Sequence, residues 1–310
     1  MRTHTTAPPF KLIASGLRFP EGPVAMPDGS VILVEIERQT LSRVTPDGAI
    51  HVVAKLGGGP NGAAMGPNGR IYVANNGGFT WIERPGKLFP GPVGPDYKGG
   101  SIQVVDPETG KFETLYDACE GRKLNGPNDL VFDGAGGFWF TDLGKTRDRD
   151  ADRGAVYYAK ADGSMIKEAI FPLERPNGIG LSPDGKTLYV VETPTARCWA
   201  FTVTAPGEID STPGRYRGEK GRVVAGLGGY QMFDSLAIDA DGHIAVATLI
   251  TGAVSDLWPD GSRVDQYVLP DMMVTNVCFG GEELRTAFAT LSMGGTLVSF
   301  EWPRAGLPLH

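Results

Sequence analysis

Six oxygen-bearing side chains recur at one position of a repeated sequence phrase, where each opens an apolar run. They are Glu21, Asn61, Asn128, Asn177, Asp234 and Asn276, and neither His nor Cys occurs among them. Carboxylate and amide oxygens without nitrogen or sulfur ligands are the donors that hard divalent cations prefer, Ca²⁺ above all. Glu21 and Asp234 carry two negative charges, which match one such cation. Any single Asn-Gly pair is also typical of a turn, but the same chemistry in all six copies favours a cation site.

The repeated phrase that carries these residues predicts a β-hairpin. It consists of an apolar run, a DG or NG turn, and a run rich in β-branched and aromatic residues. Copies begin at Phe19, Gly59, Gly126, Arg175, Phe233 and Val274, and the last copy has lost its glycine turn. Further strand candidates follow the hairpins, for example GSIQVVDPETGKFETL from Gly100. Six four-stranded units would have about 52 residues each, close to the length of a propeller blade.

The repeat therefore predicts an all-β fold, a six-bladed β-propeller with four-stranded blades, as a single domain over residues 1–310. Residues 10–17 precede the first copy and have no partner within it, so we expect this N-terminal strand to complete the last blade and close the ring. Equivalent positions on the innermost strands of a propeller converge on its central channel. Two carboxylates facing each other there without a cation would repel and be poorly solvated.

Two connections are longer than the repeat requires. Residues 79–100 are rich in Pro and Gly and contain Trp81, Phe89 and Tyr97, whereas residues 144–153 are densely charged and include Arg147. Long connections in compact domains are often functional. We therefore expect 79–100 to form a lid, and these three aromatic side chains and Arg147 to contact the substrate.

Composition and charge exclude several other classes of protein. The 44 Gly and 24 Pro residues weigh against a helical fold. A net charge of −7 without a basic cluster argues against a nucleic-acid partner. No apolar stretch is long enough to span a bilayer, and residues 1–9 do not resemble a secretion signal. The three cysteines lack CxxC spacing, so we expect no disulfide framework and a reducing, cytoplasmic location.

The sequence resembles the SMP-30/gluconolactonase/LRE (regucalcin-like) family of six-bladed propellers over essentially its whole length. The motifs that carry the resemblance are FPEGPV around Glu21, NGPNDLVFD around Asn128, RPNGIGLSPDGKTLYVVETPT around Asn177 and DSLAIDADG around Asp234. The resemblance implies that these four residues bind one catalytic divalent metal, usually Ca²⁺, at the floor of the channel. It also implies that Asn61 and Asn276 lie nearby, behind the ligands or bound to the metal through water.

Three more polar residues are candidates for the surroundings of the site. Ser235 follows Asp234, where glycine is commoner in the family. Asp142 and Glu192 are expected to end inner strands. Two roles are open for them there: contact with the metal ligands or the substrate, or acceptance of hydrogen bonds from turn N–H groups. Gly126 stands where regucalcin-type members carry an arginine, which argues against their kind of sugar recognition.

The resemblance implies a metal-dependent hydrolase that opens a lactone, a carboxylic ester hydrolase of the gluconolactonase type. The cation would polarise the ring carbonyl as a Lewis acid. Asp234 would assist the attack of water as a general base, or else attack as a nucleophile. Zn²⁺, Mn²⁺ and Fe²⁺ also accept oxygen donors and stay open beside Ca²⁺.

Other functions remain open at this point. One alternative is a metal-dependent esterase or phosphotriesterase, and another is a non-catalytic, calcium-stabilised propeller that serves as a binding module. The expected partner of either enzyme is a small molecule, and the negative net charge favours neutral lactones. The sequence predicts no oligomeric state.

Overall fold

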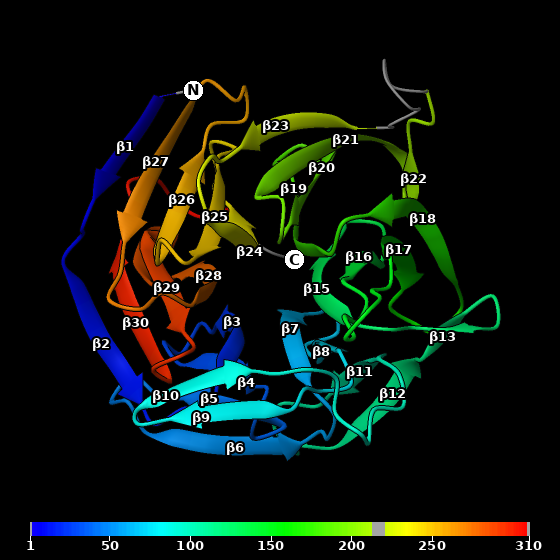
Figure 1. Cartoon of the computed structure of the whole chain (residues 1–310), viewed down its shortest axis with the longest axis horizontal. Coiled ribbons are helices and arrows are strands. Elements are labelled where there is room, and N and C mark those ends of the chain that lie inside the picture. Colours follow the sequence, from blue (N-terminus) through cyan, green and yellow to red (C-terminus); the bar gives the residue numbers. More distant parts are fainter. Residues whose placement is uncertain (1, 213–220, 309–310) are drawn as a thin grey trace.

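A computed structural model describes residues 2–212 and 221–308, and six sheets of this part of the chain surround a central channel as the blades of a propeller (Figure 1). The prediction of an all-β, six-bladed propeller is confirmed. The strands of each blade are given from the axis outwards. Blade 1 contains β3 (Pro20–Ala25), β4 (Val31–Glu35), β5 (Thr40–Val44) and β6 (Ile50–Lys55), and blade 2 contains β7 (Pro60–Met65), β8 (Ile71–Asn75), β11 (Ser101–Val105) and β12 (Phe112–Tyr116). Blade 3 contains β15 (Pro127–Phe132), β16 (Gly137–Asp142), β17 (Gly154–Lys160) and β18 (Ile166–Leu173).

Blades 4 and 5 each have five strands, and blade 6 reaches four only with a strand from the N-terminus. Blade 4 contains β19 (Pro176–Leu181), β20 (Thr187–Glu192) and β21 (Arg197–Ala205), and both β22 (Glu208–Ile209) and β23 (Arg222–Gly226) pair with β21. Blade 5 contains β24 (Met232–Ile238), β25 (Ile244–Leu249), β26 (Ala253–Leu257) and β27 (Arg263–Val268). Blade 6 contains β28 (Val274–Gly280), β29 (Thr286–Leu291) and β30 (Thr296–Glu301), with a 3-10 turn at Glu282–Leu284 where the sequence repeat lacks its glycine turn.

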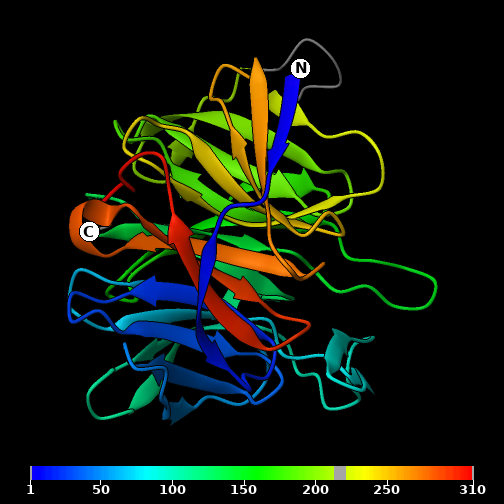
Figure 2. The same ribbon diagram turned by 90° about the vertical axis from the view of Figure 1, so that its left-hand side faces the viewer.

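The N-terminal chain closes the ring. As predicted, β2 (Phe10–Ser15) pairs antiparallel with β30 and completes blade 6. The sequence did not predict β1 (Arg2–Thr6), which adds a fifth, parallel strand to blade 5 by pairing with β27. Figure 2 shows this N-terminal segment in blue, alongside the orange and red strands of the last two blades.

The apolar core is divided among the interfaces between neighbouring blades. Ile32 of blade 1 and Ile71 of blade 2 share one buried cluster, and Tyr72 and Phe138 share the cluster between blades 2 and 3. The second strand of a blade is covered on both faces, which explains why β4 and β16 are buried throughout and read as continuous apolar runs. Outer strands such as β6 and β12 are largely exposed. In the described part of the chain, no helix is long and apolar enough to cross a membrane.

The innermost strands approach one another closely around the channel. They contact in the closed order β3, β7, β15, β19, β24, β28 and β3 again. A Cβ atom on Gly62 would lie 2.4 Å from the Asn128 carbonyl oxygen, and one on Gly178 would lie 2.6–2.8 Å from backbone atoms of residues 234–236. The turn interpretation of the PNG motifs at 60–62 and 176–178 is therefore wrong, because both lie in strands and their glycines permit the close approach of the next blade. The PNG at 67–69 does form a turn.

Gly178→Ala is expected to destabilise the fold by about 1–3 kcal/mol, the usual cost of forcing a methyl group into packed surroundings. The atoms in its way belong to the backbone of β24 and cannot rotate aside. Urea denaturation measures the change. Gly134→Ala is the matched control, since a Cβ there meets no described heavy atom within 4 Å. Equal unfolding midpoints for the two variants would contradict the close-packed ring.

Candidate metal centre

The six oxygen-bearing residues lie on the six innermost strands. Glu21 is on β3, Asn61 on β7, Asn128 on β15, Asn177 on β19, Asp234 on β24 and Asn276 on β28, and none is more than 8% exposed. In every blade, the pairing of the innermost strand with its neighbour shifts register at or beside this residue. Such irregularities release residues from the ladder and re-aim their side chains. The register shifts thus allow each innermost strand to direct a polar side chain into the channel, while apolar side chains pack between the blades.

Glu21 and Asp234 are buried carboxyl groups that influence each other's charge. Oε2 of Glu21 accepts hydrogen bonds from Nδ2 of Asn276 at 2.8 Å and from its neighbour's backbone N–H, that of Gly22, at 2.9 Å. Burial nevertheless raises the pKa of Glu21 to about 7. Burial raises the pKa of Asp234 well above its usual range, and the Glu21 carboxylate raises it further, whereas Asn177 opposes the shift. A cation held between them would stabilise the charged form of both groups.

Two amide oxygens of the ring are buried without a donor. Oδ1 of Asn61 and Oδ1 of Asn128 have no hydrogen-bond partner within residues 2–212 and 221–308. Oδ1 of Asn177 receives only a 3.4 Å contact from the Ser235 hydroxyl, while its Nδ2 donates to Thr193 at 3.1 Å. An unsatisfied buried acceptor costs about 1–3 kcal/mol, and a cation would satisfy it. The donor set therefore fits a hard divalent ion. Asn276 donates to Glu21 and so helps to position that carboxyl group.

Asp129 is a third carboxyl group of the site, and no pattern in the sequence predicts it. Its pKa is raised to about 8 by burial and, to a smaller extent, by the Glu21 charge. In a regular strand residue 129 would face away from residue 128, but the register shift between Pro127 and Leu130 releases both from that alternation. The only signal in the sequence is the acidic residue that directly follows Asn128 in PNDL.

Asp142 and Glu192 act on the backbone that precedes the innermost strands. The Asp142 carboxylate accepts hydrogen bonds from the N–H groups of Asn125, Gly126 and Gly144 at 2.7–2.9 Å. Glu192 accepts one from the N–H of Glu174 at 2.8 Å. Of the two interpretations of these residues, the structure supports the acceptor for turn N–H groups. They hold the entry to β15 and β19 and so position Asn128 and Asn177 indirectly.

The insertion 79–100 forms a hairpin of β9 (Trp81–Arg84) and β10 (Lys87–Pro90), which we call the lid hairpin. It projects from one face of the ring, the same face as the charged loop 144–153 (Figure 2). The Trp81 ring packs 5.1 Å from that of Phe19, and the Leu88 N–H donates to the Met293 carbonyl of blade 6 at 3.0 Å. The hairpin thus contacts blade 6 and the residues that lead into blade 1. Its role as a lid stays a prediction.

The other residues expected to contact substrate have protein partners. The Phe89 ring lies 5.7 Å from the Arg84 guanidinium, and the Tyr97 hydroxyl donates to the Asn125 carbonyl at 2.5 Å. Arg147 forms ion pairs with Asp150 and Asp152 of its own loop. Their contact with a substrate stays a prediction, and Arg147 would have to exchange partners to make one.

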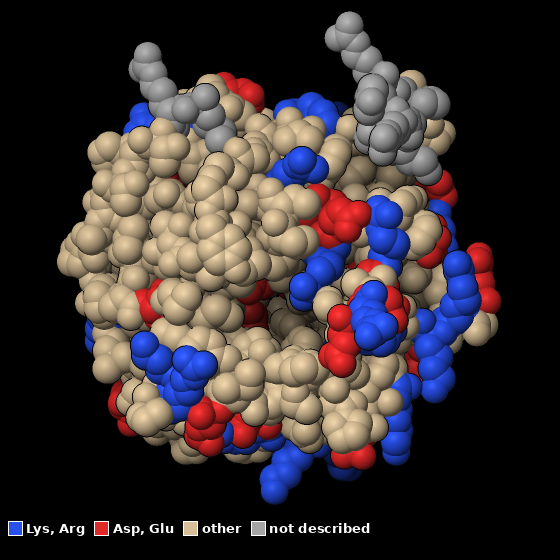
Figure 3. All heavy atoms as spheres, viewed as in Figure 1, with Lys and Arg blue, Asp and Glu red and all other residues tan. Residues whose placement is uncertain are grey.

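Two cations at the mouth of the channel were not predicted. Lys145 is 2% exposed, and its ammonium lies 4.2 Å from the centre of the Phe79 ring and 5.2 Å from that of Tyr97. Arg175 is half-buried and directly precedes β19, where its charge interacts with that of Asp234. Figure 3 shows a hollow near the centre of this face, with acidic atoms on its wall and basic side chains at its edge. Sequence patterns could not find this pair, because it forms only where the lid hairpin, the charged loop and blade 4 meet.

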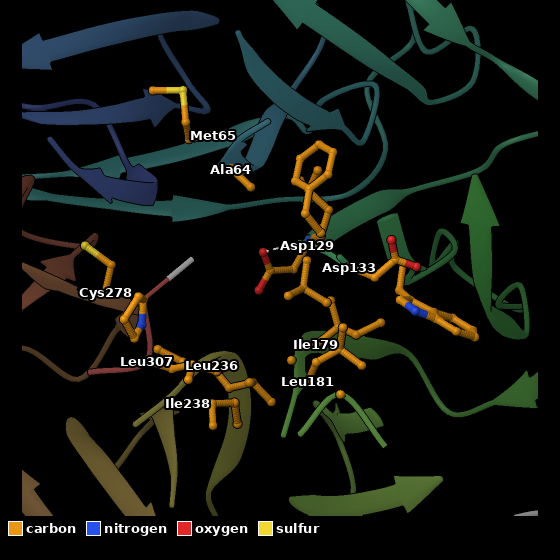
Figure 4. Close-up of a pocket in the computed structure, with 18 of the residues that line it drawn as sticks. Ala64, Met65, Asp129, Asp133, Ile179, Leu181, Leu236, Ile238, Cys278 and Leu307 are labelled. Carbon is orange, nitrogen blue, oxygen red and sulfur yellow. Dashed lines mark hydrogen bonds between the residues drawn. The ribbon is translucent and has the colours of Figure 1, made fainter. Parts of the chain in front are cut away.

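An apolar cavity of about 780 Å³ lies on the other side of the ring of oxygens. Its lining residues follow the oxygen-bearing residues along the innermost strands, toward the hairpin turns, whereas Lys145 and Arg175 precede those strands. Figure 4 shows Asp129 projecting toward the open centre of this cavity, with Met65, Leu236 and Cys278 around it. The ring of oxygens thus separates a polar mouth from an apolar cavity.

A second acidic cluster lies apart from the channel oxygens. Asp239, His243 and Asp256 bring ligand-type atoms within 4.8 Å of one another. Arg304 already supplies a positive charge there, because its guanidinium pairs with Asp239 and with Asp256 at 2.5 Å each. This cluster is a buried ion-pair network that fastens the C-terminal segment to blade 5, and it competes poorly with the channel oxygens as a metal site.

A six-bladed propeller with a ring of buried oxygen ligands on its innermost strands is the class of protein that fold and site define. The SMP-30/Gluconolactonase/LRE-like region matches residues 19–293. The chain belongs to this family, and the resemblance of its motifs is confirmed.

Individual relatives are distant. The gluconolactonase of Zymomonas mobilis is 28% identical over 309 residues, which cover 92% of this chain and 79% of that protein. The diisopropyl-fluorophosphatase of Loligo vulgaris is 28% identical over 216 residues, 64% of this chain and 64% of that protein. Among solved structures, the regucalcin of Agrobacterium tumefaciens, described as a calcium-binding protein, is similar with a TM-score of 0.75 and 19% identity over 99% of this chain and 97% of that one. At this identity, the structural likeness shows the fold.

Lys145→Met is expected to remove a pH dependence of stability. Burial lowers the pKa of Lys145 from its ordinary 10.5 to about 7; Asp142 and Asp152 oppose the shift, and Arg175 adds to it. Between these two pH values the unfolded chain binds a proton that the folded chain does not, so wild-type stability should rise with pH relative to the variant. Urea denaturation at pH 7, 8 and 9.5 measures the difference. The exposed Lys186→Met is the control, and parallel profiles for wild type and Lys145→Met would contradict the buried amine.

Proposed function

We propose that the protein is a metal-dependent hydrolase that opens a lactone. The observation that carries this proposal is the ring of buried oxygens, with two mutually destabilising carboxylates and two amide oxygens that lack a donor in the described chain. Membership of the SMP-30/Gluconolactonase/LRE-like family and the likeness to a gluconolactonase support lactone chemistry. The ligands in this proposal are Glu21, Asn128, Asn177 and Asp234.

A bound divalent cation supplies Lewis acidity, which polarises a lactone carbonyl and acidifies water. The residues of the chain contribute positioning and proton transfer. Asp234 accepts the proton of the attacking water as general base, and Asn61 offers its unpartnered oxygen to orient that water. Asn276 fixes the rotamer of Glu21, and Ser235 does the same for the Asn177 amide. The all-oxygen donor set favours Ca²⁺ over Zn²⁺, Mn²⁺ and Fe²⁺.

A second candidate is hydrolysis of organophosphate or aryl esters at the same site. The likeness to diisopropyl-fluorophosphatase favours it, since a cation can polarise a phosphoryl as well as a carbonyl oxygen. We further propose that residues 1–310 form one domain, that 79–100 covers the channel mouth, and that the protein acts in the cytoplasm on a small molecule.

Ca²⁺ added to the chelator-treated protein is expected to raise its unfolding midpoint. An ion that binds only the folded state stabilises it by about 2.7 kcal/mol at a hundred times its Kd. Glu21→Gln removes one of the two ligand charges and should lose most of this gain. The exposed Glu113→Gln serves as control. Thermal unfolding with Ca²⁺, Zn²⁺, Mn²⁺ and Fe²⁺ in turn identifies the ion, and an undiminished Ca²⁺ effect in Glu21→Gln would exclude the ring as the site.

Asp234→Asn is expected to lower kcat for lactone hydrolysis by about 10²–10⁴-fold, the usual contribution of a general base. The amide keeps an oxygen toward the ion, so the Ca²⁺-dependent rise in the unfolding midpoint should persist in part. Kinetics on lactones, aryl esters and organophosphates, with and without EDTA, measure both the effect and the reaction class. Near-normal activity of Asp234→Asn with metal still bound would show that Asp234 is not the base. A wild type without metal-dependent turnover of any of the three classes would favour the binding module.

A further inference from the structure

Arg175 is a cation without an ion-pair partner in the described chain. Its Nε atom is buried and makes no hydrogen bond, and its guanidinium forms no ion pair with any residue of 2–212 and 221–308. Its backbone adopts φ of +51°, a conformation that non-glycine residues rarely adopt. Buried arginines are normally paired, because the desolvated charge is costly when left alone. The side chain is thus held beside β19 with part of its binding capacity unused.

Lys145 is a second cation at the same mouth, and its partners are all neutral. Its ammonium donates to Oδ1 of Asn76 at 3.3 Å and to the Gly78 carbonyl at 3.1 Å. The rings of Phe79 and Tyr97 lie over it. Among the described residues, no carboxylate lies within ion-pair distance of it, and the nearby Asp142 carboxylate accepts hydrogen bonds from three backbone N–H groups instead. Lys145 and Arg175 leave the ring at the same place, because Gly154 lies against both Pro176, which follows Arg175, and the Asp142 carbonyl, three residues before Lys145. The charge of Arg175 accordingly disfavours that of Lys145.

The acidic groups of the ring do not neutralise this mouth when the ring holds a cation. Asp234 is the carboxylate whose charge acts on Arg175. In the proposed function, Asp234 and Glu21 together balance one divalent ion, so the Asp234 charge is no longer available to Arg175. Asp142 and Asp152 act on Lys145 only from beyond ion-pair distance. An anion bound at the mouth would supply the missing charge, and a planar guanidinium suits oxyanions through paired N–H donors.

We propose that Arg175 and Lys145 form a binding site for an anionic group of the substrate, a carboxylate, sulfonate or phosphate distant from the lactone carbonyl. Arg175 contacts the anion. The anion favours the protonated form of Lys145, which then adds a second positive charge beneath the rings of Phe79 and Tyr97. This inference rests on the proposed function and makes it more specific, because it selects acidic lactones over neutral ones. Ring opening itself also yields a carboxylate, so the test must separate a substrate anion from the product.

The test compares two lactones that differ in one group. Glucono-1,4-lactone ends in a hydroxymethyl group, and glucaro-1,4-lactone carries a carboxylate in its place. The wild type should have a higher kcat/KM on glucaro-1,4-lactone than on glucono-1,4-lactone. Arg175→Gln should lower the ratio of these values, glucaro-1,4-lactone over glucono-1,4-lactone, at least 10-fold. Lys145→Met should lower the ratio less, and Arg175→Lys should restore part of it. Arg153→Gln, whose arginine is exposed and paired with Glu174 at 2.8 Å, should leave the ratio unchanged.

Two results would overturn the proposal. One is an unchanged ratio in Arg175→Gln, with both lactones affected alike, which would assign the arginine to the product carboxylate or to folding. The other is a wild type that prefers the neutral lactone.

If neither lactone is hydrolysed, the proposed function fails for sugar lactones, and binding decides the anion site separately. Calorimetric titration of glucarate into Ca²⁺-loaded wild type should then show binding that weakens at least 10-fold in Arg175→Gln. No glucarate binding to the wild type would dismiss the site.

Discussion

The burial of Glu21 and Asp234 inside one ring of strands is the constraint on which the rest of the site depends. The charge of Glu21 raises the pKa of Asp234, and Asp129 adds a third carboxyl group to the same channel. Carboxyl groups in such a place are either protonated or share a cation. The amide oxygens of Asn61 and Asn128, for which the described chain offers no donor, favour the cation. The ring therefore fits the divalent cation that we propose to bind there.

The propeller separates the groups that stabilise the fold from those that serve the site. Apolar clusters lie between neighbouring blades, so the channel can hold polar residues without weakening a central core. The innermost strands must then approach closely enough for six side chains to share one channel. Gly62 and Gly178 allow this approach, because a Cβ atom at either position would collide with the backbone of the next strand. At 60–62 and 176–178, the motif PNG thus joins an oxygen-bearing residue of the ring to the glycine that lets the next innermost strand approach.

Much of this arrangement follows from the repeat in the sequence. The repeat placed Glu21, Asn128 and Asp234 on innermost strands, since equivalent positions of equivalent blades must meet at the axis. Asp129 could not be predicted, because a local register shift decides where its side chain points. Lys145 and Arg175 escaped prediction for a different reason, as their proximity arises from loops of different lengths that follow no repeat. Local sequence rules therefore predict the regular part of each blade, but not the register shifts or the loops outside the repeat.

The whole protein is negatively charged, whereas Lys145 and Arg175 place two basic groups at the channel mouth. The net charge of −7 acts over distances that salt screens beyond about 8 Å. At the mouth, desolvation strengthens short-range interactions, and the basic side chains there lack carboxylate partners within the described residues. The preference for neutral lactones that the sequence suggests rests on the net charge, whereas the proposed recognition depends on the basic side chains at the mouth. In our proposal, the buried basic side chains at the mouth select the charge of the substrate, and the net charge of the protein has little influence on it.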